Sequence, residues 1–306
     1  MKEVNLVIDA KATLGEGAIW DYKNNRILWI DIEECSLNIF YPNEKENRKI
    51  KLNQKIGTVV PVEIFENVVL IALEDGIYYL VLASEHVYKM IDLESKIKNN
   101  RFNDGKCDPA GRFWVGSMDM NLSEGKGSLY CIDTNLSVKK NISGVTISNG
   151  IAWSVDSTMM YYIDTPTRAV AEYRYNIETA SIKYSRIAIE IEKELGYPDG
   201  MTIDSEGKLW IAMWGGGYVT RWDPETGKLL EKIELPALNV TSCAFGGKNL
   251  DTLYITSAIE GVSEENRNKY PFNGGLFSVK PGITGIKANY FDVDVNLIKG
   301  DKSGNN

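Results

Sequence analysis

Short apolar stretches, each preceded by a polar turn, recur along the chain. Six of them centre on one large apolar or aromatic residue: Trp29, Ile71, Trp114, Tyr162, Trp210 and Tyr254. These residues recur at intervals of 42–48 residues, which is the length of a unit made of about four short strands. The pattern predicts an all-β protein, a six-bladed β-propeller with four-stranded antiparallel blades around a central channel.

The residues between the predicted strands favour hairpin turns. Examples are Asn24-Asn25, Asp156-Ser157 and Asp223-Pro-Glu-Thr-Gly227, whose residue types supply the backbone conformations that tight turns require. A helical period bounded by caps is not evident, although residues 187–195 could form a helical turn or two. The six units use residues 1–298 as a single domain and leave 299–306 as a polar C-terminal tail.

A propeller avoids an open sheet edge by pairing the two ends of its chain. Residues 6–8 are apolar enough for a strand, and so are the C-terminal stretches 276–279 and 290–293. We therefore expect the first stretch to close the ring beside the other two.

Composition narrows the range of partners. The 306 residues are 43% hydrophobic and 25% charged, with 34 Lys and Arg against 42 Asp and Glu, a net charge of −8. This is a globular composition, and its acidic balance argues against binding nucleic acid or an anionic membrane. The longest apolar runs are too short to span a bilayer and residues 1–14 lack a signal-peptide core, so we expect a cytoplasmic protein. The sequence leaves a monomer and a dimer equally open.

Cysteine and histidine usage removes several mechanisms. The four cysteines, Cys35, Cys107, Cys131 and Cys243, are widely separated, which favours buried thiols over a disulfide framework or a zinc site. The single histidine, His86, excludes two-histidine zinc sites within one chain, and no G-x-S-x-G motif supports a serine triad. We expect His86 to be an ordinary strand or surface residue. Catalysis would then depend on carboxylates, amides, Lys, Arg or a metal.

Four of the six units carry a polar residue followed by glycine immediately before their first predicted strand, 10–13 residues ahead of the central apolar residue. The pairs are Glu16-Gly17, Asp104-Gly105, Asn149-Gly150 and Asp199-Gly200, and the other two units present Val60-Pro61 and Thr241-Ser242. One such pair is typical of a turn. Four at the same position of a propeller blade would instead converge at the end of the innermost strands, around the channel.

The predicted cluster has the chemistry of a cation site. Carboxylates that converge at a channel mouth repel one another unless a cation neutralises them. All the donors are hard oxygens, which favour Ca²⁺, Mg²⁺ or Mn²⁺ over a dedicated zinc site. Arg101 lies two residues from Asn103 and would add a planar set of donors suited to an oxygen-rich substrate.

Five ordered motifs across nearly the whole chain resemble the regucalcin (senescence marker protein) and gluconolactonase family. They are Leu14–Gly17, Arg101–Gly111, Ser148–Gly150, Pro198–Met201 and Cys243–Asn249. The resemblance implies a six-bladed propeller that binds one divalent cation, Ca²⁺ first, with Zn²⁺, Mn²⁺ or Mg²⁺ as alternatives, and hydrolyses a small sugar lactone or a related lactone. By motif position it also implies metal ligands at Glu16, Asn149 and Asp199, substrate contacts at Arg101 and Asn103, and an acid/base role for Asp199.

The segment after Met118 departs from the family. Regucalcin-type members have a longer segment there, with a glutamate that helps to hold the sugar, whereas residues 119–126 are short in this chain. Asp119, Asn121 and Glu124 are the candidates for a substitute contact, and the identity of the lactone stays open.

The expected mechanism is metal-dependent lactone hydrolysis. The cation would polarise the lactone carbonyl, while Asp199 takes a proton from water and returns it to the ring oxygen. A hydroxide on the cation is the alternative nucleophile. Two other functions stay open, a phosphotriesterase-like hydrolase on the same site and a non-catalytic calcium-binding propeller. Gly215–Gly217 matches no phosphate loop, so we expect a loop at the channel mouth with Trp214 lining the pocket.

Overall fold

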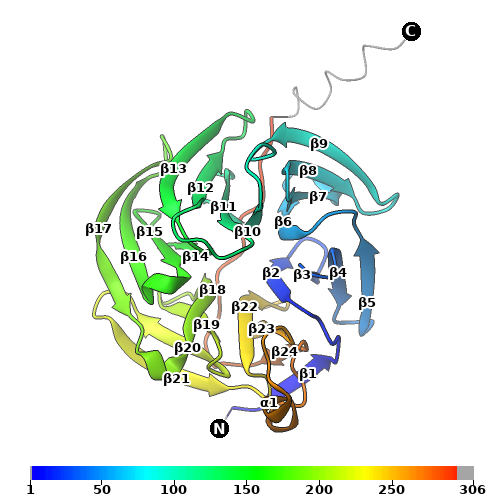
Figure 1. The fold of residues 1–306 in the computed structure, drawn as a ribbon, viewed down its shortest axis with the longest axis vertical. Coiled ribbons are helices and arrows are strands. Elements are labelled where there is room, and N and C mark those ends of the chain that lie inside the picture. Colours follow the sequence, from blue (N-terminus) through cyan, green and yellow to red (C-terminus); the bar gives the residue numbers. More distant parts are fainter. Residues whose placement is uncertain (1, 295–306) are drawn as a thin grey trace.

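Six four-stranded antiparallel sheets surround a central axis in the computed structural model, which describes residues 2–294 (Figure 1). The predicted all-β six-bladed propeller is confirmed. In each blade one strand lies nearest the axis and is called the inner strand. From it the chain runs outward through the next two or three strands of that blade.

The blades follow one another in chain order, each listed from its inner strand outward. The first three are β2 (Gly15–Asp21), β3 (Arg26–Asp31), β4 (Ser36–Tyr41) and β5 (Glu46–Lys51); β6 (Ile56–Val62), β7 (Phe65–Leu73), β8 (Gly76–Val81) and β9 (His86–Asp92); and β10 (Asn100–Cys107), β11 (Phe113–Asp119), β12 (Gly127–Ile132) and β13 (Val138–Val145). The last three are β14 (Ser148–Trp153), β15 (Met159–Asp164), β16 (Ala169–Asn176) and β17 (Ser181–Glu190); β18 (Tyr197–Ile203), β19 (Leu209–Trp214), β20 (Tyr218–Asp223) and β21 (Lys228–Glu234); and β22 (Asn239–Gly246), β23 (Thr252–Ala258), β24 (Leu276–Val279) and β1 (Val4–Ile8).

In the described part of the chain, helical structure is confined to one short helix and two 3₁₀ turns. Helix α1 (Glu264–Lys269) begins after Ser263, whose side chain accepts a hydrogen bond from the backbone N–H of Asn266, as an N-cap does. The expected helical turns at 187–195 are largely wrong, because β17 continues to Glu190 and only Lys193–Leu195 forms a 3₁₀ turn. Within residues 2–294, no helix has the length and apolar character needed to cross a membrane.

The sixth blade is completed by the first strand of the chain. β1 pairs antiparallel with β24, with Val4 opposite Val279 and Ile8 opposite Leu276. The predicted closure by residues 6–8 and 276–279 is therefore confirmed. Every blade then has four strands, and the ring has no gap between the first and the sixth blade (Figure 1).

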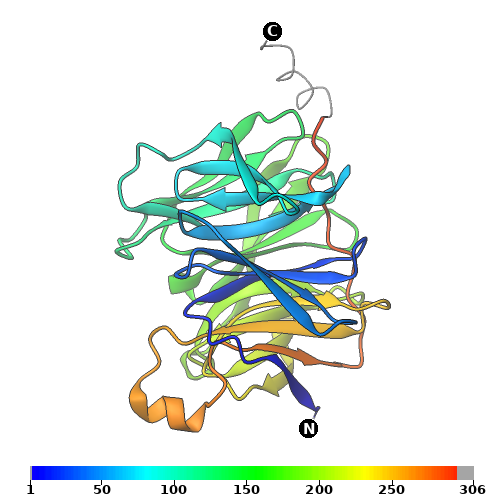
Figure 2. The ribbon, with the colours of Figure 1, turned by 90° about the vertical axis from the view of Figure 1, so that its right-hand side faces the viewer.

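The expectation that residues 290–293 also pair in this closure was wrong. Residues 281–294, called here the C-terminal strap, run across the face of the ring opposite α1 (Figure 2). Phe291 exchanges backbone hydrogen bonds with Pro61 and Glu63, and the N–H of Asp292 donates to the carbonyl of Gly111. The strap thus ties neighbouring blades together at one end of the channel. The predicted tail at 299–306 lies outside the described residues.

The six central apolar residues predicted from the repeat are all buried. Trp29, Ile71, Trp114, Tyr162, Trp210 and Tyr254 are between 0 and 6% exposed. They occupy the second strand of their blades, where both faces of a sheet are covered by neighbouring blades, so continuous apolar runs are favoured over strict alternation. Packing between blades therefore forms the core.

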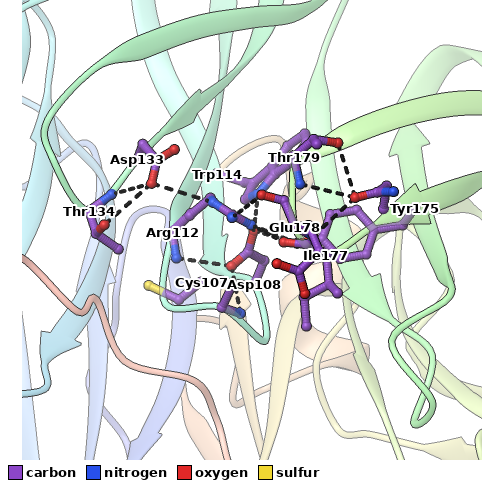
Figure 3. A network of polar contacts seen from close by, with 12 residues as sticks. Cys107, Asp108, Arg112, Trp114, Asp133, Thr134, Tyr175, Ile177, Glu178 and Thr179 are labelled. Carbon is purple, nitrogen blue, oxygen red and sulfur yellow. Dashed lines mark hydrogen bonds and ion pairs between the residues drawn. The ribbon is translucent and has the colours of Figure 1, made fainter.

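A buried aspartate, Asp108, lies in a polar network that connects two blades (Figure 3). Asp108, which is fully buried, accepts hydrogen bonds from the Trp114 indole at 2.9 Å and the Tyr175 hydroxyl at 2.6 Å. Arg112 forms an ion pair with the same carboxylate at 3.5 Å and donates to the backbone carbonyls of Ile177 at 2.6 Å and Glu178 at 3.0 Å. Because Tyr175 and these carbonyls belong to the next blade, the network holds the third and fourth blades together.

The cysteines and the histidine have no special arrangement. Cys107, Cys131 and Cys243 are buried and Cys35 is half-buried, and all four are free thiols. Burial raises the pKa of Cys243 to about 12, so this thiol stays protonated at neutral pH. His86 is exposed at the start of β9, which agrees with the prediction of an ordinary strand residue.

Candidate active site

The inner strands share one irregularity that turns side chains toward the axis. Each breaks its register with the second strand of its blade: between Glu16 and Ile19, Ile56 and Thr58, Phe102 and Gly105, Ser148 and Ile151, Pro198 and Met201, and Val240 and Ser242. Such β-bulges leave residues unpaired and redirect side chains. The sixfold repeat of this feature explains why one blade position supplies the polar residues of the site.

These bulges correct two details of the sequence prediction. The polar–glycine pairs lie within the inner strands, not before them. In the second blade the corresponding irregularity is at Gly57, because Val60 and Pro61 pair regularly with Leu70 and Val69. A Cβ atom at Gly57 would lie 2.3 Å from the carbonyl oxygen of Phe102. Glycine there allows β6 to approach β10 closely.

A cavity of about 330 Å³ opens at the channel end opposite the strap, and all five predicted site residues line it. Glu16, Arg101, Asn103, Asn149 and Asp199 come from four inner strands and are at most 8% exposed. The structure thus brings together residues that are more than 180 positions apart in the sequence, as the repeat predicts. Their chemical roles remain predictions.

A chain of hydrogen bonds fixes the orientation of the amide side chains. Arg101 Nη1 donates to Asn103 Oδ1 at 2.6 Å, and Asn103 Nδ2 donates to Asn149 Oδ1 at 3.1 Å. Asn149 Nδ2 donates to the Thr165 hydroxyl at 2.7 Å, which in turn donates to the Pro198 carbonyl at 2.8 Å. Asn149 therefore presents its Oδ1 on the side of Asn103 and its amide nitrogen on the side of Thr165.

Thr165 is a site residue that the sequence reasoning missed. It lies in the 3₁₀ turn Thr165–Thr167 after β15, outside the inner strands, and it lines the cavity. Its hydroxyl connects Asn149 to the residue just before Asp199. The polar–glycine pattern occurs only in the inner strands. It therefore could not predict Thr165, which follows β15, the second strand of its blade.

Glu16 and Asp199 form a buried pair of carboxyl groups. Burial is the main cause that raises the pKa of Glu16 to about 8, and the negative charge of Asp104 is the second. The Gly17 N–H and Arg101 oppose this shift. Burial and the neighbouring charges of Glu16 and Asp104 raise the pKa of Asp199 well above its ordinary value. Two adjacent buried carboxylates are unfavourable when both are ionised, so the pair holds protons at neutral pH unless another positive charge is present.

Asp104 acts on this pair through its charge and does not line the cavity. Its carboxylate accepts a hydrogen bond from the Gly105 N–H at 2.7 Å. Burial raises the pKa of Asp104, and the nearby Lys106 ammonium opposes that shift. Lys106 donates to the Met201 carbonyl and lines a smaller cavity of about 170 Å³ beside the strap.

The residues at the cavity mouth fit a hard divalent cation. Asp199 Oδ1 is buried and forms no hydrogen bond within the described part of the chain, which is rare for a carboxylate oxygen in a folded protein. Glu16 and Asn149 add a carboxylate and an amide oxygen on the same cavity wall. Among residues 2–294 no three His, Cys, Asp or Glu side chains are grouped to hold a metal, so the Asn149 amide is the side chain here that could complete such a site with the two carboxyl groups. Mixed carboxylate and amide oxygens are typical of Ca²⁺ sites.

The rim of the cavity is held by Asn239 at the start of β22. Its Oδ1 accepts a hydrogen bond from the Gly215 N–H at 3.1 Å, and its Nδ2 donates to the Glu260 carbonyl at 2.6 Å. The two loops that it joins carry Trp214 and Glu260, which both line the cavity. Trp214 and the turn at 215–217 therefore lie at the channel mouth, as expected.

The short segment 119–126 contributes an apolar side chain to the site. Leu122 lines the cavity, whereas Asp119, Asn121 and Glu124 are not among its lining residues. Asp119 Oδ1 instead accepts hydrogen bonds from the backbone and side-chain nitrogens of Asn121, at 3.1 and 3.3 Å. The sequence reasoning considered only the polar residues of this segment and so overlooked Leu122.

Comparisons with known proteins agree with the fold and the motifs. The family model described as the SMP-30/Gluconolactonase/LRE-like region matches residues 14–259. A Bacillus subtilis (strain 168) protein named "Putative sugar lactone lactonase YvrE" is 38% identical over 95% of this chain and 99% of its own length. Regucalcin from Danio rerio is 37% identical over 93% of this chain and 96% of its own. A solved structure of luciferin-regenerating enzyme superposes with a TM-score of 0.91 at 33% identity, covering 96% of this chain and 100% of that chain.

Proposed function

Because this chain belongs to the SMP-30/gluconolactonase/LRE-like family, we propose that it is a divalent-metal-dependent hydrolase that opens lactones. The observation that carries the proposal is the buried Glu16–Asp199 carboxyl pair, which shares one cavity with Asn149 and Arg101. The name of the Bacillus subtilis relative points to the same reaction class, and Ca²⁺ is the cation that the donor set favours.

Glu16, Asn149 and Asp199 would hold the cation. When bound, a divalent cation supplies a Lewis acid that polarises a carbonyl and stabilises negative charge on its oxygen. The chain's contribution is to keep these oxygens in place. Asn149 is fixed by Asn103 on one side and Thr165 on the other, and the Gly17 N–H donates to Glu16 Oε2 at 3.0 Å.

Asp199 is the proposed acid/base. Its Oδ1 has no hydrogen-bond partner, so this atom is free to accept a proton from a water molecule that attacks the lactone carbonyl carbon. The same oxygen then returns the proton to the ring oxygen as the carbon–oxygen bond of the ring breaks, which gives a hydroxy acid. The Asp199 carboxylate must be ionised to begin this cycle, so it needs the positive charge of the site to offset its raised pKa.

Arg101 and Asn103 orient the substrate. The Arg101 guanidinium lines the cavity, and its hydrogen bonds to the Phe102 carbonyl and Asn103 Oδ1 both come from Nη1. The other guanidinium nitrogens are then available to the lactone oxygens. Holding a substrate in the reactive orientation lowers the barrier by several kcal/mol in well-oriented model reactions, about 7–11 kcal/mol at the upper end.

A pH-stat assay tests the proposal. Protein treated with chelator and then supplied with Ca²⁺, Mn²⁺, Zn²⁺ or Mg²⁺ should release acid from lactones of five- and six-membered rings. Asp199→Asn should lower kcat/KM by about 10²–10⁴-fold, which is the usual contribution of general acid/base catalysis. Glu16→Gln should weaken cation binding and lower activity in parallel.

Glu124→Gln is the matched control, since this carboxylate belongs to the short segment and does not line the cavity. It should leave kcat/KM within a factor of about two. Activity that survives both Glu16→Gln and Asp199→Asn would contradict the assignment of the site. A protein that binds Ca²⁺ but hydrolyses no lactone would favour a non-catalytic calcium-binding propeller, and hydrolysis of phosphotriesters alone would favour the phosphotriesterase-like function.

A further inference from the structure

The wall of the active-site cavity is polar at one end and apolar elsewhere. The polar part consists of the proposed cation ligands with Arg101, Asn103, Thr165 and Glu260. Apart from Leu14, which precedes β2, the apolar part is formed by Met118, Leu122, Ile147, Pro166, Tyr197 and Trp214. These six residues come from three consecutive blades and the loops between them, so the apolar part of the wall is more than a single exposed residue.

Leu122 is the least expected member of this wall. Its side chain is 59% exposed, so it gains little from burial in the protein itself. Its backbone has φ of +59°, a conformation that branched and bulky residues rarely adopt and that glycine or asparagine accepts more easily. Neither the packing nor the turn requires leucine here, whereas an apolar ligand in the cavity would cover it.

Most hydrogen-bond donors of the polar end are already used within the protein. Asn103 Nδ2 donates to both the Ser148 carbonyl and Asn149 Oδ1, so both of its hydrogens are committed. The Thr165 hydroxyl donates to Pro198. Arg101 and the carboxyl groups remain, including that of Glu260. They can bind the ester group of a lactone, but they leave few partners for the several hydroxyls of an aldonolactone.

We propose, on the basis of the proposed function, that the preferred substrates are lactones with an alkyl or other apolar substituent and few hydroxyl groups. The ester group faces Glu16, Asn149 and Asp199, and the apolar substituent packs against Leu122 and Met118. A polyhydroxylated ring in the same place loses hydrogen bonds to water that the apolar wall does not replace, and such unmet hydrogen bonds disfavour binding. Leu122 is thus a specificity-determining residue.

The test compares two substrates on one protein. With the cation that gives the highest activity, kcat/KM is measured above the uncatalysed rate for a δ-lactone bearing a four-carbon alkyl chain and for glucono-δ-lactone. We expect at least a tenfold preference for the alkyl lactone. Leu122→Asn should reduce this ratio by about tenfold, because it removes the apolar contact while asparagine tolerates the left-handed turn.

Leu230→Asn serves as the matched control, since Leu230 is 47% exposed on the outer strand β21 and does not line the cavity. It should leave the substrate ratio unchanged. Ile147→Thr provides a second variant on the same wall and should shift the ratio in the same direction as Leu122→Asn. Melting temperatures of all variants establish that each is folded before the ratios are compared.

Binding without turnover gives an independent readout. An alkyl-substituted δ-lactam, which resists hydrolysis, should change the fluorescence of Trp214, and this change should disappear in Trp214→Phe. Gluconolactam at the same concentration should produce a change at least tenfold smaller.

A substrate ratio that favours glucono-δ-lactone, or one that Leu122→Asn leaves unchanged, would overturn the inference while leaving the lactonase proposal intact. If every lactone is inert with every cation, the proposed function fails, and the lactam titration still decides whether the cavity prefers apolar rings.

Discussion

Glu16 and Asp199 show how one pair of side chains connects stability with ligand binding. Both carboxyl groups are at least nine-tenths buried. Burial and the negative charge of Asp104 raise the pKa of each, and the charge of Glu16 also raises the pKa of Asp199. The folded protein therefore holds protons that the unfolded chain would release at neutral pH. Under the proposed function, a bound cation would replace these protons, and the same residues would respond to both pH and metal.

This linkage predicts a pH-dependent stability for the chelator-treated protein. The pKa of Glu16 is about 8 in the folded state against 4.5 ordinarily, so between these values the folded state binds more protons than the unfolded state. The free energy of unfolding must then fall as the pH rises through this window, by up to about 1.4 kcal/mol per pH unit for each proton held. Urea unfolding of the metal-free protein at several pH values from 5 to 8.5 measures this slope.

Glu16→Gln should flatten the slope, because glutamine cannot titrate. Added Ca²⁺ should stabilise the unmodified protein more at pH 8 than at pH 5, since it competes with protons for the same oxygens, and about 2.7 kcal/mol is expected at a concentration 100 times its Kd. A metal-free protein whose stability stays constant or rises between pH 5 and 8 would contradict the raised pKa values.

At the scale of elements, the blades depend on buried aspartates between strands. Asp108 accepts hydrogen bonds from Trp114 and Tyr175, and the fully buried Asp204 repeats the arrangement with the Trp210 indole at 2.9 Å and Arg221 Nε at 2.7 Å. In both cases the aspartate follows the inner strand and fixes the indole of the second strand. These contacts tie the end of the inner strand to the start of the second strand in the third and fifth blades.

Asp108→Ala should destabilise the protein by about 3–5 kcal/mol, because it removes the buried carboxylate that pairs with Arg112 and that accepts from the Trp114 indole N–H and the Tyr175 hydroxyl. Asp133→Ala is the control. Asp133 pairs with the same Arg112 at 3.4 Å but its side chain is 42% exposed, so its loss should change the free energy of unfolding by about 1 kcal/mol or less. Equal effects of the two substitutions in urea unfolding would contradict this account of the network.

The same elements show how much of the molecule the sequence predicts. The central apolar residues and the polar–glycine pairs repeat with the blades, so the fold, the ring closure by β1 and the convergence of Glu16, Asn149 and Asp199 could be predicted. Leu122 and Thr165 lie in loops that do not repeat, and their contact with the cavity depends on the turn geometry of one blade only. The strap has no regular hydrophobic period because it crosses blades and pairs with each by only one or two backbone bonds.

For the whole molecule, the strap determines which end of the channel is open. It crosses the face of the ring opposite α1 (Figure 2). There Tyr290 donates to the buried Asp21 carboxylate at 2.7 Å and accepts from the Lys23 N–H at 3.1 Å. Burial raises the pKa of the Tyr290 hydroxyl, so it remains a donor at neutral pH. Substrate and product are therefore expected to pass through the mouth near Trp214.

Tyr290→Phe should weaken the attachment of the strap without unfolding the propeller. The lost hydrogen bond leaves a buried carboxylate with one partner fewer, a change of about 1–3 kcal/mol. Hydrogen exchange should accelerate at the N–H groups of Phe291 and Asp292, which donate to Pro61 and Gly111, far more than at those of the blade cores. Tyr184→Phe, at an exposed position, is the control. Uniform acceleration over the whole ring would show that the strap is not a separate unit of stability.

The closure of the sixth blade also sets the order in which the protein can mature on the ribosome. β1 precedes every other strand of the ring, yet its partner β24 is made about 270 residues later. At a usual elongation rate of about 5–20 residues per second, the nascent chain waits for many seconds with one strand unpaired. The sixth blade thus cannot be completed until β24 has been made, and until then the unpaired strand is open to pairing with wrong partners.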